Sequence, residues 1–174
     1  TERGPSRSVI GNFPISEIIE DPTKGLWFFD DFLATPNIPA GAEAQIGIYK
    51  GFADTGGSVT EADIVGGVKT FSSDGDDEGA SLATVSKPFQ IDRGQGRCVF
   101  GCRMKTSTIT DTKHGIFFGL IDTSTLSATV PIAAAGTLAD ENFVGFHRLE
   151  GDGDAIDTVY KANGVTQVTL QTDA

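Results

Sequence analysis

Two histidines are the first side chains in this sequence that could serve as a catalytic base. His114 lies in the polar segment DTKHG, and His147 alternates with Phe146 and Arg148 in a strand-like run. A hydrolytic triad needs a nucleophile, a base and a third group that orients the base. Because the sequence has no G-x-S-x-G motif to present a nucleophile, we expect both histidines to be structural.

Paired carboxylates are the second option, since glycosidases place two carboxyl groups about 5–9 Å apart around the scissile bond. The laminarinase-like motif E-x-D-x-x-E puts its first two carboxylates on one face of a strand. Glu150 and Asp152 begin this motif, but Ala155 stands where its second glutamate belongs. Glu61 and Asp63 begin it as well and also lack the final glutamate. The broken motif argues against a glycan-active enzyme, and we expect no catalytic residues.

Acidic turns are the third option, because carboxylate oxygens are calcium ligands. Asp74, Asp76, Glu78 and Gly79 match the first half of an EF-hand loop, but Val85 replaces the bidentate glutamate. Solvated, glycine-rich turns explain this cluster equally well, and they also explain a second acidic cluster that begins at Asp152. We therefore expect no metal and no cofactor. The acidic residues that remain as metal candidates, in the second cluster, are Asp152, Asp154 and Asp157.

The two cysteines, Cys98 and Cys102, are four residues apart. On a strand this spacing is about 13 Å, which is too far for a disulfide. One CxxxC pair without a second cluster is also a poor zinc signal. The spacing favours two reduced, packed thiols, consistent with assembly in a cytoplasm.

The charge balance of the 174-residue chain excludes some classes of partner. It has 13 basic and 24 acidic residues, a formal net charge of −11 and no basic stripe. Such a surface repels nucleic acid and anionic lipid. No run reaches the ~18 apolar residues of a membrane span, and the first residues lack the apolar core of a signal peptide. We expect no nucleic-acid partner, no membrane association and no secretion by the Sec route.

The elements that must position these side chains are short β-prone runs, separated by turns rich in Gly, Asp and Ser. They predict an all-β fold, a two-sheet antiparallel β-sandwich over residues 25–174. Gly119 and Gly145 lie inside two of the strongest runs, which predicts a bulge or a close backbone approach. Residues 123–139 are expected to be a loop. The predicted strands span residues 25–33, 44–52, 64–72, 81–91, 97–107, 115–122, 143–149, 155–161 and 165–172, with an N-G hairpin turn at 162–164.

Residues 1–24 differ from the rest, because prolines and glycines interrupt them. We interpret them as an extended N-terminal arm that docks on a partner, with a frayed terminus as the alternative. The apolar side chains that would anchor such an arm are Val9, Ile10, Phe13, Ile15, Ile18 and Ile19.

Several fragments resemble a family of phage-encoded, concanavalin-like jelly-roll structural proteins. They are WFFDDFL at 27–33, FFGLIDTS at 117–124, NFVGFHRLEGDGD at 142–154, CRMKTS at 102–107 and VYKANGVTQ at 159–167. The resemblance covers residues ~25–172 and implies a jelly-roll sandwich. It transfers no catalytic residues to this chain.

Together, this resemblance, the acidic surface and the arm predict a non-enzymatic virion protein, a capsid decoration (cement or head auxiliary) protein. It would sit on the exterior of a phage head after assembly in the host cytoplasm. The expected partners are the major coat protein and further copies of the chain in an oligomer or lattice. Either such a neighbouring subunit or the arm at 1–24 would complete an otherwise open sheet edge. The alternative is a lectin-like module that binds host glycans through the 123–139 loop or the Asp152–Asp157 turn, with Trp27 or Tyr49 as an aromatic contact.

Overall fold

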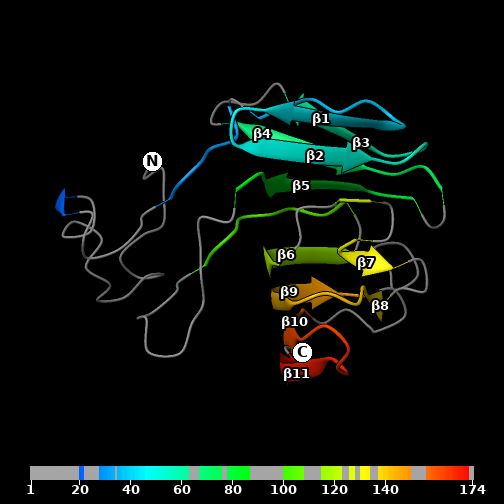
Figure 1. The fold of residues 1–174 in the computed structure, drawn as a ribbon. Coiled ribbons are helices and arrows are strands. Elements are labelled where there is room, and N and C mark those ends of the chain that lie inside the picture. The colour runs from blue at the N-terminus through cyan, green and yellow to red at the C-terminus, as the bar shows by residue number, and fades with distance from the viewer. Residues whose placement is uncertain are drawn as a thin grey trace.

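A computed structural model describes residues 20–21, 28–33, 35–62, 67–75, 78–86, 100–107, 115–122, 126–127, 130–133, 137–149 and 156–172. Within these ranges every complete element is a β-strand, and every strand pair is antiparallel (Figure 1). The predicted all-β class is therefore confirmed. The proposed arm, its boundary with the domain and all six of its anchors lie outside the described residues.

The first group of strands forms a three-stranded sheet in the order β1-β2-β5 and a separate β3–β4 hairpin that packs against it. Its core contains the fully buried side chains of Ile38, Ala53 and Val59. Ile38 and Val59 also exchange backbone hydrogen bonds of 2.7 and 2.9 Å, which fixes the preceding segment on the hairpin. The strands are β1 (Ala42–Ile46), β2 (Tyr49–Ala53), β3 (Ser58–Ala62), β4 (Val68–Ser72) and β5 (Ala80–Thr84).

The second group forms a four-stranded sheet in the order β11-β10-β9-β6, drawn in the lower half of Figure 1. Its core contains Leu138, Phe143 and Val159, with Phe117 and Ile121 packed against them. A small β7–β8 pair occupies part of the segment that was predicted to be a loop. The strands are β6 (Ile116–Ile121), β7 (Ile132–Ala133), β8 (Thr137–Leu138), β9 (Phe143–Arg148), β10 (Asp157–Lys161) and β11 (Val168–Thr172).

Three strand predictions were wrong within the described residues. Residues 44–52 are not one strand, because Gly47, with a φ of 58°, turns the chain between β1 and β2. Residues 28–33 form no strand, and Phe32 adopts a left-handed φ of 62°. Residues 100–107 also lie outside any strand. The β3 strand was not predicted from the sequence, because its segment Ser58–Ala62 carries little apolar character.

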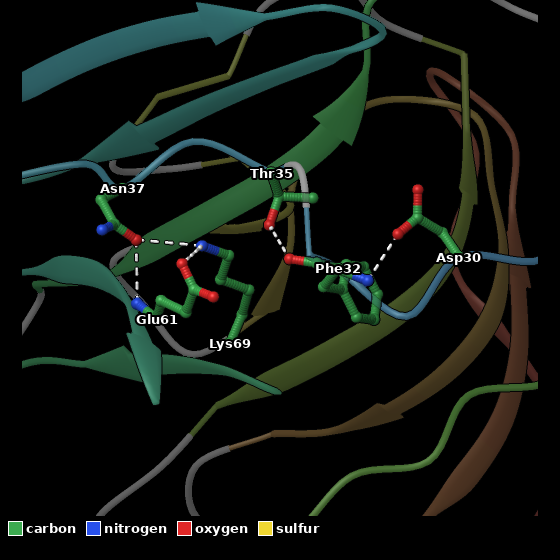
Figure 2. A network of polar contacts seen from close by, with 6 residues as sticks. All are labelled: Asp30, Phe32, Thr35, Asn37, Glu61 and Lys69. Carbon is green, nitrogen blue, oxygen red and sulfur yellow. Dashed lines mark hydrogen bonds and ion pairs between the residues drawn. The ribbon is translucent and has the colours of Figure 1, made fainter. Parts of the chain in front are cut away.

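The segment from Asp30 to Ile38 crosses the first group of strands and is held there by polar contacts (Figure 2). The Asn37 side-chain oxygen accepts hydrogen bonds from the Glu61 backbone N–H at 2.8 Å and from Lys69 Nζ at 2.9 Å. The Lys69 side chain is only 2% exposed, and its ammonium lies 3.9 Å from the Glu61 carboxylate. This buried cation therefore depends on Asn37 for a close acceptor.

Candidate functional site

An open groove lies between the loop after β8 and the β10–β11 hairpin. Its volume is about 470 Å³. The groove is wide open to solvent, so it is a shallow depression in the surface and not an enclosed cavity. The residues that line it are Thr137, Leu138, Asp140, Lys161, Gly164, Val165, Thr166 and Gln167.

The N-G turn of the hairpin shapes one wall of the groove, and this turn was predicted correctly from the sequence. Gly164 has a φ of 73°, a conformation that glycine adopts without strain. Its N–H donates to Asp140 Oδ1 at 2.8 Å, and the Asn163 N–H donates to Asn142 Oδ1 at 2.9 Å. Two side-chain acceptors of the 140–142 loop therefore hold the turn in place.

Lys161 is one of the lining residues of the groove, and its side chain is 12% exposed. Its Nζ donates to the carbonyl oxygens of Ala139 at 2.7 Å and Leu138 at 3.3 Å, and lies 3.3 Å from Asp140 Oδ1. The Gly164 N–H bond, and then Lys161, lower the pKa of Asp140. Because the three donors of an ammonium all have acceptors here, Lys161 is held as a structural cation.

Gln167 connects the groove to the buried His147 behind it. Gln167 Nε2 lies 2.7 Å from His147 Nε2, and His147 is fully buried. An amide nitrogen can only donate, so His147 Nε2 accepts in this pairing. Asp157 is paired with His147 across β9 and β10 and is also buried. Asp157, one of the predicted metal-ligand candidates, is therefore a buried residue of the β9–β10 strand pair.

Two acidic residues of the EF-hand-like segment do come together, near Gly56. A Cβ at Gly56 would overlap both Glu78 Oε2 and Asp74 Oδ1, so these oxygens lie within hydrogen-bond distance of each other. The hydrogen bond with Asp74, then desolvation and the charges of Asp74 and Asp54, raise the pKa of Glu78. The neighbouring Asp74 carboxyl therefore makes the Glu78 carboxyl hold its proton more strongly than an isolated glutamate does.

The described residues do not form a metal site. Within those residues, no three His, Cys, Asp or Glu side chains are grouped so that they could hold a metal ion. Several predicted residues lie outside the described ranges: His114, Trp27, Glu150, Asp63, Asp76, Cys98, Asp152 and Asp154.

Two predictions need correction, one about the Tyr49 ring as a sugar contact and one about Cys102 as a packed thiol. Tyr49 is 6% exposed and lies with its ring 6.3 Å from that of Phe32, so it is not an open platform for a sugar. Burial, and then the nearby Asp30 carboxylate, raise the pKa of this tyrosine. Cys102 is a free thiol, but the residue is exposed where a packed one was expected. Partial burial of its sulfur raises its pKa, which disfavours a reactive thiolate.

Apolar side chains are exposed at the β11 end of the second sheet. The strand register places Leu120, Val144, Tyr160 and Val168 in one row across β6, β9, β10 and β11. Tyr160 and Val168 are exposed at the end of this row, and Leu170 is 60% exposed. A cluster of this kind on an acidic protein is typical of a surface that contacts another protein.

Sequence reasoning named His147 and Asp157 but missed Asp140, Lys161 and Gln167. The N-G hairpin was the sequence signal that could have pointed to these residues, because its turn had to pack against a neighbouring loop.

Among the described residues, no helix has the length and apolar character needed to cross a bilayer. Comparison with known proteins found no matching family model, no matching curated protein and no matching solved structure.

Proposed function

We propose that this chain is a non-enzymatic virion protein that decorates the exterior of a phage head and clamps adjacent coat subunits. The observation that carries the proposal is the exposed apolar end of the second sheet, at Tyr160, Val168 and Leu170. A protein of net charge −11 has abundant polar surface, so apolar side chains left in water together mark a contact surface.

The two groups of antiparallel strands support a finer statement of the fold. We propose that they are the two layers of a jelly-roll sandwich, as the resemblance to phage structural proteins implies. Such a sandwich is a rigid body that can present a sheet face to a coat subunit. No chemistry is required of it, and its buried polar residues Lys69, Lys161 and His147 serve to fix loops and strands.

The proposed arm would supply the second contact with the capsid. Each apolar anchor, such as Phe13 or Ile18, would contribute roughly 1.5–3 kcal/mol when fully enclosed by the partner. Attachment at many symmetric positions would add avidity. The arm and the sheet together would span the boundary between two coat subunits.

Co-sedimentation with phage heads stripped of the protein tests this function. The full chain is expected to bind saturably, at a fixed ratio to coat subunits. A chain lacking residues 1–20 is expected to lose attachment and to keep its far-ultraviolet circular dichroism spectrum. Failure of the full chain to bind heads would contradict the decoration function, and binding by the truncated chain would contradict the role of the arm.

A lectin-like function is the second candidate, and the groove favours it. Thr137, Asp140 and Gln167 provide hydroxyl, carboxylate and amide groups, which are suited to sugar hydroxyls. A glycan array with and without calcium tests this candidate. Binding that is lost in the variant Gln167→Ala would support the groove, whereas no bound glycan would leave only the decoration function.

A further inference from the structure

Three side chains of different chemistry meet where the segment before β1 crosses the β3–β4 hairpin (Figure 2). They are the amine of Lys69, the carboxamide of Asn37 and the carboxylate of Glu61. Lys69 Nζ lies 2.9 Å from Asn37 Oδ1 and 3.9 Å from Glu61 Oε2. Transfer of an acyl group to an amine needs these three groups: a nucleophile, an acyl carbon and a carrier for the proton.

The backbone on both sides of this contact is fixed. Asn37 lies between Pro36 and Ile38, whose side chains are both fully buried. Ile38 is joined to β3 by two backbone hydrogen bonds of 2.7 and 2.9 Å. Glu61 and Lys69 are direct partners across β3 and β4, so their side chains leave the same face of the hairpin. The amine and the carboxamide are therefore held together before any reaction, which removes most of its entropic cost.

The surroundings of Asn37 Oδ1 activate the carboxamide. The Glu61 backbone N–H donates to this oxygen at 2.8 Å. When an amine attacks Cγ, negative charge develops on Oδ1, and a donor already aimed at that oxygen stabilises the charge. The Lys69 side chain is only 2% exposed, so its amine is shielded from bulk water, whereas Asn37 is exposed and a leaving group can escape to solvent.

We propose that Lys69 and Asn37 form an isopeptide bond, an amide that joins the two side chains, with Glu61 as the proton carrier. The Glu61 carboxylate takes one proton from the Lys69 ammonium, and the lone pair of Nζ attacks Cγ of Asn37 to form the Nζ–Cγ bond. The carboxyl passes its proton to Nδ2 and takes the second proton from Nζ. The Cγ–Nδ2 bond breaks, the carbonyl is restored and ammonia leaves, taking up the remaining proton as ammonium.

This reaction needs no oxidant, reductant or cofactor. The only product besides the cross-linked chain is one ammonium ion, and the chain loses one positive charge. The carboxylate of Glu61 ends in the state in which it began.

Lys161 shows why a buried lysine alone is not enough. Its side chain is 12% exposed, and its Nζ donates to the backbone carbonyls at 138 and 139 beside the Asp140 carboxylate. These acceptors include no side-chain carboxamide, so attack on them would have to cut the backbone or expel an oxide. Lys161 therefore stays a free amine, whereas Lys69 faces an acyl carbon that has ammonia as its leaving group.

The bond would lock the entry segment onto the β3–β4 hairpin. It would join two residues that are 32 positions apart and close the chain between them. A covalent closure of this kind stabilises a protein mainly by restricting its unfolded chain. The stability that the hydrogen bond itself contributes belongs to the unreacted chain, which is recognised by its full mass. The inference does not rest on the proposed function, because the reaction requires no partner.

Intact-mass spectrometry of the purified full chain tests the proposal. After incubation at neutral pH until the mass is constant, the denatured chain should weigh one ammonia molecule less than its sequence. A protease digest should contain a branched peptide that joins Asn37 to Lys69. A chain that keeps its full mass would overturn the proposal. Loss of ammonia that maps to Asn163, where cyclisation onto Gly164 also releases ammonia, would overturn it as well.

Matched variants separate the three roles. Lys69→Arg keeps a cation but removes the nucleophilic amine, so the full mass should be retained. Glu61→Gln keeps the backbone N–H but removes the proton carrier, and it should slow the loss of ammonia roughly 100-fold or more. Glu43→Gln is the control, since Glu43 pairs with Lys50 at 3.3 Å on another strand pair and should react like the parent.

These variants also provide outcomes that would refute the assignment. Glu61→Gln that reacts at the rate of the parent would remove Glu61 from the reaction. Equal slowing in Glu61→Gln and Glu43→Gln would indicate a general effect of charge. Loss of ammonia at Asn37 in Lys69→Arg would show that the lysine is not the nucleophile. Circular dichroism of each variant establishes that it is folded, and the mass of the parent chain decides the proposal even if one variant is not.

Discussion

Gly119 and Gly145 face each other across β6 and β9 so closely that a Cβ on either would lie 2.7 Å from the Cα of the other. The Phe117 ring reaches over this pair, 3.0 Å from the Cβ position of Gly119, and meets Phe143 in an edge contact with ring centroids 5.2 Å apart. The two glycines therefore bring the strands together and make room for the aromatic core.

The variant Gly145→Ala should destabilise the protein, because the added methyl group would collide with the backbone of β6. We expect a loss of about 1–3 kcal/mol, the usual cost of overpacking. Urea denaturation measures it. Gly101→Ala is the control, since a Cβ there would meet nothing within 4 Å and should leave the midpoint nearly unchanged. Equal midpoints for the two variants would contradict this account of the glycine pair.

The Asn37 side chain should stabilise the protein mainly by solvating the buried Lys69 ammonium, 2.9 Å away. Asn37→Ala is expected to cost about 1–3 kcal/mol, as for a buried polar group that loses its partner. In a Lys69→Met background the same change should cost less, because the buried cation is gone. Chemical denaturation of the four proteins of this cycle gives the coupling. Additive losses would show that Asn37 and Lys69 act independently.

The sequence predicted the second sheet well and the first sheet poorly. Ile116–Ile121, Phe143–Arg148 and the last hairpin carry alternating apolar residues or a strong turn signal. In the first sheet, the apolar run at 44–52 concealed a tight turn at Gly47. The segment at 28–33 is aromatic-rich like a strand, but it lies outside any strand, and its Phe32 ring contacts the ring of Tyr49 in the first sheet. Local patterns do not report such contacts.

The candidate groove was less predictable than the fold. It is built from the 137–140 segment and the 161–167 segment, which no local motif connects. The key contact, Lys161 with the carbonyls of Leu138 and Ala139, is between a side chain and a distant backbone. Spacing rules for catalytic or metal-binding residues cannot detect a contact of this type, because it uses no recognisable set of ligands.

Glu78 should make the folding stability fall as the pH rises through mildly acidic values. Its folded pKa is raised above the ordinary 4.5, chiefly by its hydrogen bond with Asp74. The stabilising contribution of this bound proton is complete below the unfolded pKa and is lost as the pH rises through the folded pKa. Thermal unfolding between pH 4 and pH 8 measures the effect.

The variant Glu78→Gln provides the control for that pH dependence. The amide cannot ionise and can still donate to Asp74, so the variant should not lose stability over the same pH range. Glu20→Gln, outside the carboxyl cluster, should retain the slope of the parent protein. A parent protein and a Glu78→Gln variant with identical slopes would rule out the Glu78 proton as the cause.

Asp140 should produce the opposite pH dependence at the groove. Its folded pKa is lowered below the ordinary 3.8, first by the Gly164 N–H and then by Lys161. Its contribution to stability is present above the unfolded pKa and is lost as the pH falls through the folded pKa. Asp140→Asn should therefore lower the melting temperature at neutral pH and reduce the loss of stability in acid. Glu141→Gln is the neighbouring control. If both variants melt like the parent at pH 7, the carboxylate does not hold the β10–β11 hairpin against the 140–142 loop, and the groove has another structural basis.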